Sequence, residues 1–258
     1  MGEKLIKNLI EDCIDGYEDY EIREFFGDRF IEKRKIRNLQ EIKMEALISR
    51  IYPLKNTPAK VLDLGCGISP FSIYLSKAGY DVTCTDKYEI FLEKTEEIAK
   101  KYEVENIYFV RREFDNLGFK KEFDVIFSSD SLVSKLGLLP IFESGSKKEK
   151  EHAITKQKEL IVSMIEEGKS RDDFVDYERG INVCVPYSLK AFEEAREALV
   201  DDGYLFLGVS CSNPHCSLMD ENFKLLNMAG FEKYSEEKYV RKMFRYAVFK
   251  KSPQVSSA

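Results

Sequence analysis

The feature that most constrains the fold of this chain is a short apolar strand that runs into a glycine-rich turn. Residues 61–70 read Val-Leu-Asp-Leu-Gly-Cys-Gly-Ile-Ser-Pro. Ser69 and Pro70 suit the N-cap and the first position of a helix, so the segment predicts a strand, a tight turn and a helix in succession. Glycine lets the backbone approach a ligand closely, and open α/β sheets bind ligands where their strands end. We therefore expect a ligand site at this turn.

Strands and helices alternate around the turn. We predict strands at residues 61–64, 81–85, 107–110, 123–127 and 204–210, followed by a final pair at 231–234 and 244–249. Ser188 and Asp220 can cap the later helices, and the sequence of residues 201–203, Asp-Asp-Gly, predicts a turn. Such alternation implies parallel pairing in a doubly wound sheet. The final two strands are separated by only a short polar stretch, so they should be antiparallel.

The regular pattern divides the chain into segments. Residues 1–56 are charged and have a helical apolar period, which predicts an N-terminal helical cap. Residues 57–251 form the predicted main domain, in which residues 133–187 are too long for a simple connector and predict a helical insertion. Residues 252–258 predict a disordered tail.

Composition narrows the class of partner. The formal net charge of the 258 residues is -6, whereas nucleic-acid binders usually carry a basic footprint, so nucleic acid is disfavoured as a partner. The six cysteines form no CxxC pair, which favours reduced thiols in the cytoplasm. The sequence has no apolar run of the roughly 18–20 residues that a membrane helix requires, and no signal-peptide pattern. We expect a cytoplasmic protein without a membrane partner; the oligomeric state is not predicted.

Two classes of cofactor use a glycine-rich turn at this place, and the residues distinguish them. A dinucleotide fingerprint requires a glycine or alanine where this chain has Pro70. S-adenosylmethionine carries no phosphate and needs no anion cradle, and its ammonium and sulfonium groups suit the acidic Asp63. Asp86, at the end of the second predicted strand, can accept both ribose hydroxyls, which supports a nucleoside of either class.

Further motifs carry a resemblance to a known family. Glu113 follows the third strand, Asn116-Leu117 comes soon after, and Phe-Asp-Val-Ile at residues 123–126 starts the fourth. With the glycine-rich turn, these motifs resemble the class I (Rossmann-like) S-adenosylmethionine-dependent methyltransferases over roughly half of the chain. The resemblance implies an α/β fold with a doubly wound, seven-stranded, mostly parallel sheet in the order 3-2-1-4-5-7-6. It implies methyl transfer from S-adenosylmethionine.

The resemblance also assigns site residues by position. The turn would line the methionine part, Asp86 would hold the ribose, and Glu113 with the Phe114 backbone would face the adenine; Asp115 is the alternative to Glu113. The full set of cofactor-binding residues implied is Asp63, Gly65, Cys66, Gly67, Asp86, Lys87, Glu113, Phe114 and Ser128.

No catalytic residue can be assigned from the sequence. Methyl transfer from a sulfonium chiefly needs alignment, and a base is needed only when the acceptor must lose a proton. Asp130 and His215 are weak candidates because each follows a strand of the sheet. Cys211 and Cys216 flank His215, but their spacing matches no standard zinc pattern, so no metal is predicted.

The acceptor has several interpretations. The acidic charge and the cap-like segments favour a small-molecule acceptor. Alternatives are an RNA methyltransferase, given the basic cluster from Lys33 to Arg37, and a protein that binds S-adenosylmethionine without catalysis. The aromatic residues Tyr17, Tyr20 and Phe25 could stack on adenine or acceptor, although ordinary packing is the preferred interpretation.

Overall fold

The computed structural model describes most of the predicted sheet and its helices. The described residues are 3–17, 33–54, 58–129, 189–210, 223–235, 238–240 and 244–252. The predicted insertion at 133–187 and the predicted caps Ser188 and Asp220 lie outside them. The division into cap, main domain and insertion therefore remains a prediction.

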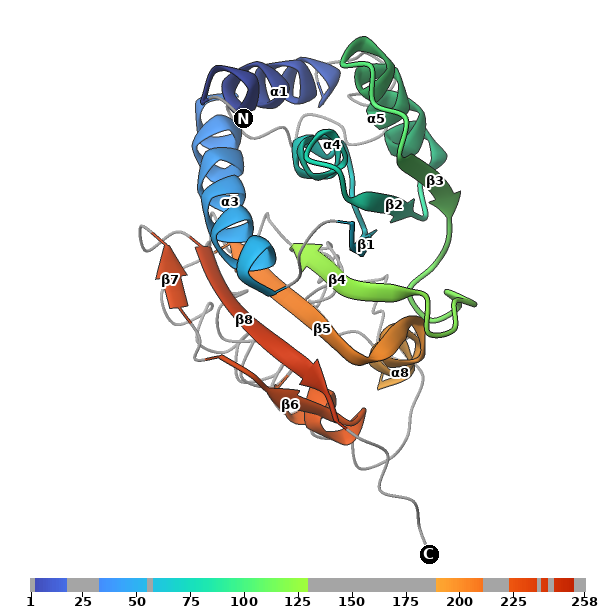
Figure 1. Ribbon diagram of the computed structural model, residues 1–258. Helices are drawn as coiled ribbons and strands as arrows, with labels where there is room; N and C mark the ends of the chain where they lie inside the picture. Colours follow the sequence, from blue (N-terminus) through green and yellow to red (C-terminus); the bar gives the residue numbers. More distant parts are fainter. Residues whose placement is uncertain are drawn as a thin grey trace, which may run out of the picture.

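The strands form one mixed sheet, shown edge to edge in Figure 1. The strand order is β3-β2-β1-β4-β5-β8-β6, with parallel pairing from β3 to β5 and antiparallel pairing of β8 with β5. The strands are β1 (Lys60–Leu64), β2 (Asp81–Asp86), β3 (Ile107–Arg111), β4 (Phe123–Ser129), β5 (Leu199–Ser210), β6 (Phe231–Lys233), β7 (Lys238–Val240) and β8 (Phe244–Lys251). The predicted doubly wound topology is confirmed.

The strands β6 and β7 share one position in the sheet. Lys233 of β6 pairs with Phe249, and Lys238 of β7 pairs with Tyr246, while β5 occupies the opposite edge of β8. Together they act as one interrupted strand beside β8. The sheet therefore has seven positions in the predicted order 3-2-1-4-5-7-6.

The turn predicted at residues 201–203 is instead part of β5, which begins earlier, at Leu199. Phe123 pairs with Leu199 and Val125 with Tyr204, so residues 200–203 bulge opposite the single residue between the two β4 partners. A Cβ at Gly203 would lie 2.9 Å from Cδ2 of Leu199 and 3.0 Å from the Val200 carbonyl oxygen, so the tight bulge favours a glycine. Because residues on both sides of the bulge pair with β4, the predicted turn becomes part of the strand.

Helices cover both faces of the sheet (Figure 1). On one face lie α1 (Glu3–Tyr17), α3 (Lys33–Leu54), α4 (Pro70–Lys77) and α5 (Glu89–Lys101), and on the other lie α8 (Leu189–Ala198) and a short helix at residues 223–228. None of the described helices is both long and apolar enough to cross a bilayer.

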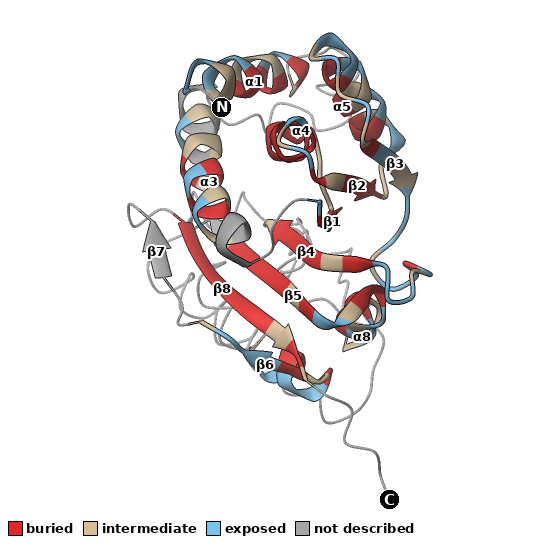
Figure 2. Cartoon of the chain, viewed as in Figure 1, coloured by how far each residue is buried: buried red, intermediate tan, exposed pale blue. Residues whose placement is uncertain are grey.

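Two apolar cores sit on the two faces because strand side chains alternate. Val61 and Phe206 belong to the core under α1 and α4, whereas Leu62 and Leu205 belong to the core under α8. Figure 2 shows β1, β4, β5 and β8 mostly buried, as expected for strands covered on both faces.

The predicted boundaries of α4 are confirmed. Ser69 is the N-cap, and its hydroxyl accepts the N–H of Ser72 at 3.1 Å. Pro70 occupies the first helical position, and Gly79 follows the helix with a φ of 94°. These local signals place the turn at residues 65–69 directly between β1 and α4.

The close approach of β5 and β8 gives a stability prediction. A Cβ at Gly208 would overlap the ring of Phe244, which is fully buried. Gly208→Ala should therefore lower the free energy of unfolding by about 1–3 kcal/mol in chemical denaturation. Combination with Phe244→Leu should cost less than the sum of the two single changes, and strict additivity would contradict the proposed clash.

Candidate functional site

The backbone N–H groups of the glycine-rich turn are all engaged by the protein. Five consecutive N–H groups donate to oxygens from three neighbouring elements: Gly65 and Cys66 to the Thr85 carbonyl (2.8 and 2.9 Å), Gly67 to Oδ2 of Asp86 (3.0 Å), Ile68 to the Tyr17 hydroxyl (2.9 Å) and Ser69 to Oγ1 of Thr95 (3.4 Å). A dinucleotide site needs such N–H groups to face a pyrophosphate. In this turn they face the protein, which disfavours a dinucleotide and fits a cofactor without phosphate.

The two glycines of the turn are required by its backbone. Gly65 has a φ of 74° and Gly67 a φ of 56°, a region that residues with a Cβ avoid. The turn therefore has a fixed shape, held by positive φ angles and by hydrogen bonds on its N–H groups.

Asp63 lies at the end of β1 with only 2% of its surface exposed. Its Oδ2 accepts the hydroxyls of Ser69 at 2.7 Å and Ser72 at 2.5 Å, so the start of α4 orients the carboxylate. Burial raises the pKa of Asp63 from 3.8 to about 6, although the two hydroxyl donors oppose the rise. This carboxyl group can therefore change its charge near neutral pH.

Asp86 lies at the end of β2 and connects the turn to α5. Its Oδ2 accepts the N–H of Gly67 and its Oδ1 that of Tyr88, both at 3.0 Å. Burial raises its pKa, and the backbone donors from Tyr88, Gly67 and Lys87 oppose the rise. A carboxylate has about four acceptor positions, so beside these three backbone donors one position is left for a ribose hydroxyl.

A cavity of about 430 Å³ opens beyond the ends of β2 and β3. Lys87, Arg111, Arg112, Glu113, Asp115 and Asn116 line it. The cavity thus brings together Lys87 and Glu113, both predicted at the site, with Asp115, the alternative to Glu113. Arg111 fixes one wall, since its Nε donates to the Lys87 carbonyl at 3.1 Å.

Other predicted residues lie elsewhere or are not described. Phe114 is half-buried against the core under α8, and Ser128 is fully buried in β4; neither lines the cavity. Asp130 and His215 lie outside the described residues, as do Tyr20 and Phe25.

The sequence reasoning missed two residues that hold the turn. Ser72 donates to Asp63, and the Thr95 hydroxyl accepts from the N–H of Ser69. The single proton of that hydroxyl has the carbonyls of Phe91, at 2.8 Å, and Gly67, at 3.1 Å, as acceptors. A signal for Thr95 exists, because it is a polar residue on the otherwise apolar face of α5 that carries Phe91. Ser72 gives no comparable signal.

Comparison with known proteins adds the family. A sequence model described as Tellurite resistance protein TehB matches residues 31–166, just over half of the chain. The chain belongs to the TehB family. No sequence among the curated proteins matches this TehB-family chain significantly.

Solved structures share the fold of this TehB-family chain. A magnesium protoporphyrin IX methyltransferase from Synechocystis PCC 6803, with S-adenosylhomocysteine bound, is 15% identical with a TM-score of 0.56, and the match covers 97% of this chain and 100% of the other. The PH0226 protein from Pyrococcus horikoshii OT3 is 17% identical with a TM-score of 0.55, over 92% and 99%. A SAM-dependent methyltransferase from Aquifex aeolicus is 15% identical with a TM-score of 0.52, over 81% and 89%.

The family, the fold and the glycine-rich turn all indicate methyl transfer from S-adenosylmethionine. The TehB-family chain is a class I methyltransferase, and its cofactor is S-adenosylmethionine. The predicted recognition, enzyme class and cofactor are confirmed, while the roles of single residues at the site stay predictions.

The predicted role of Asp63 makes the folding stability and the S-adenosylmethionine affinity depend on pH in opposite directions. Because folding raises its pKa from 3.8 to about 6, protonated Asp63 favours the folded protein; this contribution is present below pH 3.8 and is lost as the pH rises through about 6. The cofactor's positive charges require the ionised form instead. From pH 7 to pH 5, S-adenosylmethionine affinity should therefore fall about tenfold.

Calorimetric titration at pH 5, 6 and 7 measures the affinity, and thermal denaturation of the cofactor-free protein measures the stability. Asp63→Asn removes this titrating group, so the affinity and the stability should each depend less on pH than in the unchanged protein. An unchanged pH dependence of binding in Asp63→Asn would assign the effect to another group.

Proposed function

We propose that this TehB-family protein transfers the methyl group of S-adenosylmethionine to a small-molecule acceptor. The observation that carries the cofactor site is the turn at residues 65–69, whose N–H groups all donate to protein oxygens and leave no phosphate cradle. We assign the ribose to Asp86, the methionine part to the turn and Asp63, and the adenine to the cavity beside Glu113 and Lys87.

In this assignment the residues of the chain mainly orient the cofactor and remove it from water. Asp86 would accept a ribose hydroxyl while its bond to Gly67 ties the ribose position to the turn. Asp63, oriented by Ser69 and Ser72, would place negative charge beneath the cofactor's positive groups. The cofactor supplies an activated methyl group, so alignment with the acceptor supplies much of the rate.

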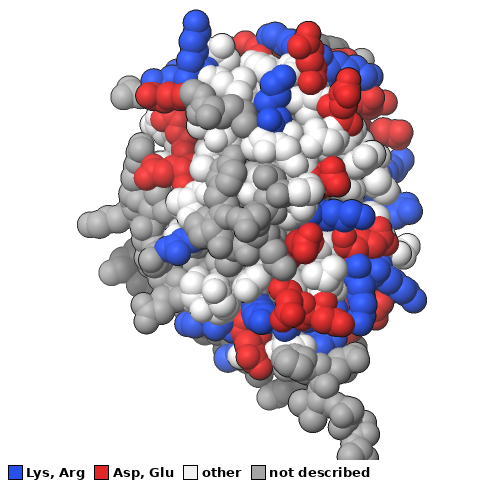
Figure 3. Space-filling model, in the orientation of Figure 1, with Lys and Arg blue, Asp and Glu red and all other residues white. Residues whose placement is uncertain are grey.

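The surface charge of the protein favours a small-molecule acceptor over RNA. The net charge is -6, and Figure 3 shows Lys and Arg interspersed with Asp and Glu among the described residues of that face. In the basic cluster that suggested RNA, Arg37 is paired with Glu11, with Nη2 and Oε2 2.6 Å apart. The magnesium protoporphyrin IX methyltransferase, which matches nearly the whole chain, acts by its name on a porphyrin. This supports a small-molecule acceptor.

Two broader assignments accompany this proposal. Residues 1–56 would cap the cofactor site, which is supported by the position of α1 against the turn. A cytoplasmic location is supported by the free thiols of Cys13, Cys66 and Cys84.

The ribose assignment predicts a specific loss of affinity. Asp86→Ala should weaken S-adenosylmethionine binding at least about tenfold, because hydrogen bonds to a charged group contribute roughly 1.5–3 kcal/mol each. The matched control is Asp81→Ala, at the opposite end of the same strand, which should leave the affinity unchanged. Equal affinities of the two variants in calorimetric titration would mean that the ribose lies elsewhere.

The acceptor class is tested by following formation of S-adenosylhomocysteine. The purified protein is incubated with S-adenosylmethionine and one of two fractions of a single cell culture. One fraction is a protein-free metabolite extract and the other is total RNA. Turnover with the metabolite fraction is expected. Turnover only with RNA, together with RNA binding that weakens steeply with salt, would contradict the small-molecule acceptor.

A further inference from the structure

The last residue of α1 lies directly on the glycine-rich turn. The hydroxyl of Tyr17 accepts the N–H of Ile68 at 2.9 Å. The ring of Tyr17 packs edge-on against Phe91 of α5, with centroids 6.0 Å apart. Burial raises the pKa of Tyr17 well above its ordinary value, so the neutral hydroxyl persists throughout the neutral pH range.

The same hydroxyl fills the space beside Gly67. A Cβ built on Gly67 would lie 2.6 Å from the Tyr17 hydroxyl, and its next neighbour, the Tyr17 Cζ, is 3.9 Å away. The Tyr17 hydroxyl oxygen therefore accepts a hydrogen bond from the turn. It also limits how far the turn can move toward α1. Gly67 and Ile68 are the residues on which this oxygen acts.

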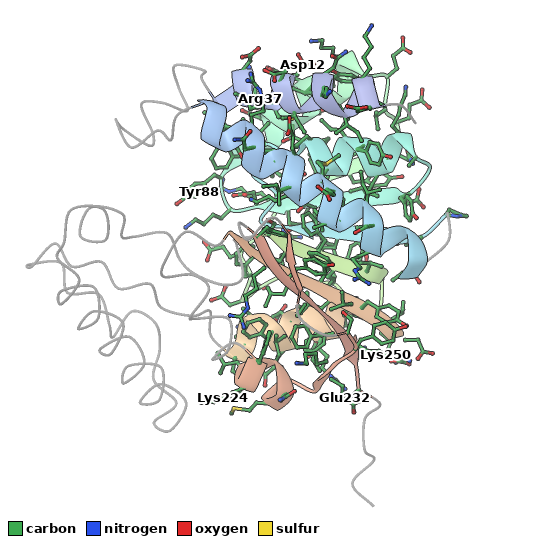
Figure 4. The ribbon with its side chains drawn as sticks, turned by 90° about the vertical axis from the view of Figure 1, so that its left-hand side faces the viewer. Asp12, Arg37, Tyr88, Lys224, Glu232 and Lys250 are labelled. Carbon is green, nitrogen blue, oxygen red and sulfur yellow. The ribbon has the colours of Figure 1, made fainter. Side chains whose placement is uncertain are left out.

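Helix α1 is itself fixed on α5, which determines where Tyr17 lies. Asp12 accepts the ammonium of Lys101 at 2.7 Å and the hydroxyl of Tyr102 at 2.6 Å. A Cβ on Gly16 would lie 3.2 Å from Cδ1 of Ile68, so a side chain there would crowd the turn. Figure 4 shows Asp12 on α1 at the end of the molecule away from Lys224, Glu232 and Lys250.

From these contacts we infer that Tyr17 is a positioning residue for the cofactor site, whose hydroxyl couples the docking of α1 to S-adenosylmethionine affinity. The inference rests on the proposed function, since it takes the turn as the cofactor's methionine site. Without the hydroxyl, the Ile68 N–H loses its acceptor and the turn can leave the shape that binds. If the turn is competent for only a fraction of the time, the apparent dissociation constant is the intrinsic one divided by that fraction, and it therefore rises.

The direct test is Tyr17→Phe with Tyr102→Phe as its matched control. Both changes remove one tyrosine hydroxyl that links α1 to the rest of the protein, but only Tyr17 touches the turn. Tyr17→Phe should raise the dissociation constant for S-adenosylmethionine about tenfold in calorimetric titration. In Tyr102→Phe the contact of Asp12 with Lys101 still holds α1 on α5, so this variant should lower the melting temperature but leave the affinity within twofold of the unchanged protein.

A double substitution separates the hydroxyl from general damage. Gly67→Ala places its Cβ against the Tyr17 hydroxyl, and adding Tyr17→Phe removes the oxygen it meets. The double variant should bind S-adenosylmethionine no more weakly than Gly67→Ala alone. Additive losses would contradict the contact as the cause.

Hydrogen exchange gives a readout independent of turnover. Coupling is reciprocal, so saturating S-adenosylmethionine should slow amide exchange in α1 of the unchanged protein, and less so in Tyr17→Phe. If the unchanged protein binds and Tyr17→Phe binds equally well, with only a lower melting temperature, the inference is overturned and Tyr17 is a packing residue. An unchanged protein that binds no S-adenosylmethionine would instead contradict the proposed function.

Discussion

The hydrogen bonds on the N–H groups of the glycine-rich turn are the constraint on which the site depends. Their acceptors come from β2, α1 and α5, through Thr85 and Asp86, Tyr17, and Thr95. Buried N–H groups without partners are costly, so the turn keeps its shape only when all three elements are in place. The parallel sheet, the docking of α1 and the position of α5 therefore converge on five residues of backbone.

That arrangement also decides the electrostatics of the site. Asp63 and Asp86 are both buried near the turn, and burial raises the pKa of each. Hydroxyls of Ser69 and Ser72 support the first carboxylate, and backbone N–H groups support the second. Two buried acids beside a turn without a phosphate cradle are the basis on which we propose a ligand that is positively charged and carries a ribose.

Much of the fold follows from local patterns in the sequence, because those patterns reflect short-range physics. The cap at Ser69, the proline after it and the glycine after α4 fix the helix wherever the sheet lies. The sequence predicts a turn at residues 201–203, whereas these residues lie in the β5 bulge, because strand pairing with β4 is a tertiary effect. Tyr17 and Ile68 are 51 positions apart in the sequence, and only the docking of α1 brings them into contact. From the sequence alone, Tyr17 is therefore interpreted only as a packing residue.

The central claim is most directly tested by calorimetric titration of the purified protein with S-adenosylmethionine, S-adenosylhomocysteine and NAD. The engaged N–H groups of the turn predict binding of both adenosyl ligands and no binding of NAD, which needs a pyrophosphate cradle. Binding of NAD alone, or of none of the three ligands, would contradict the account of the site.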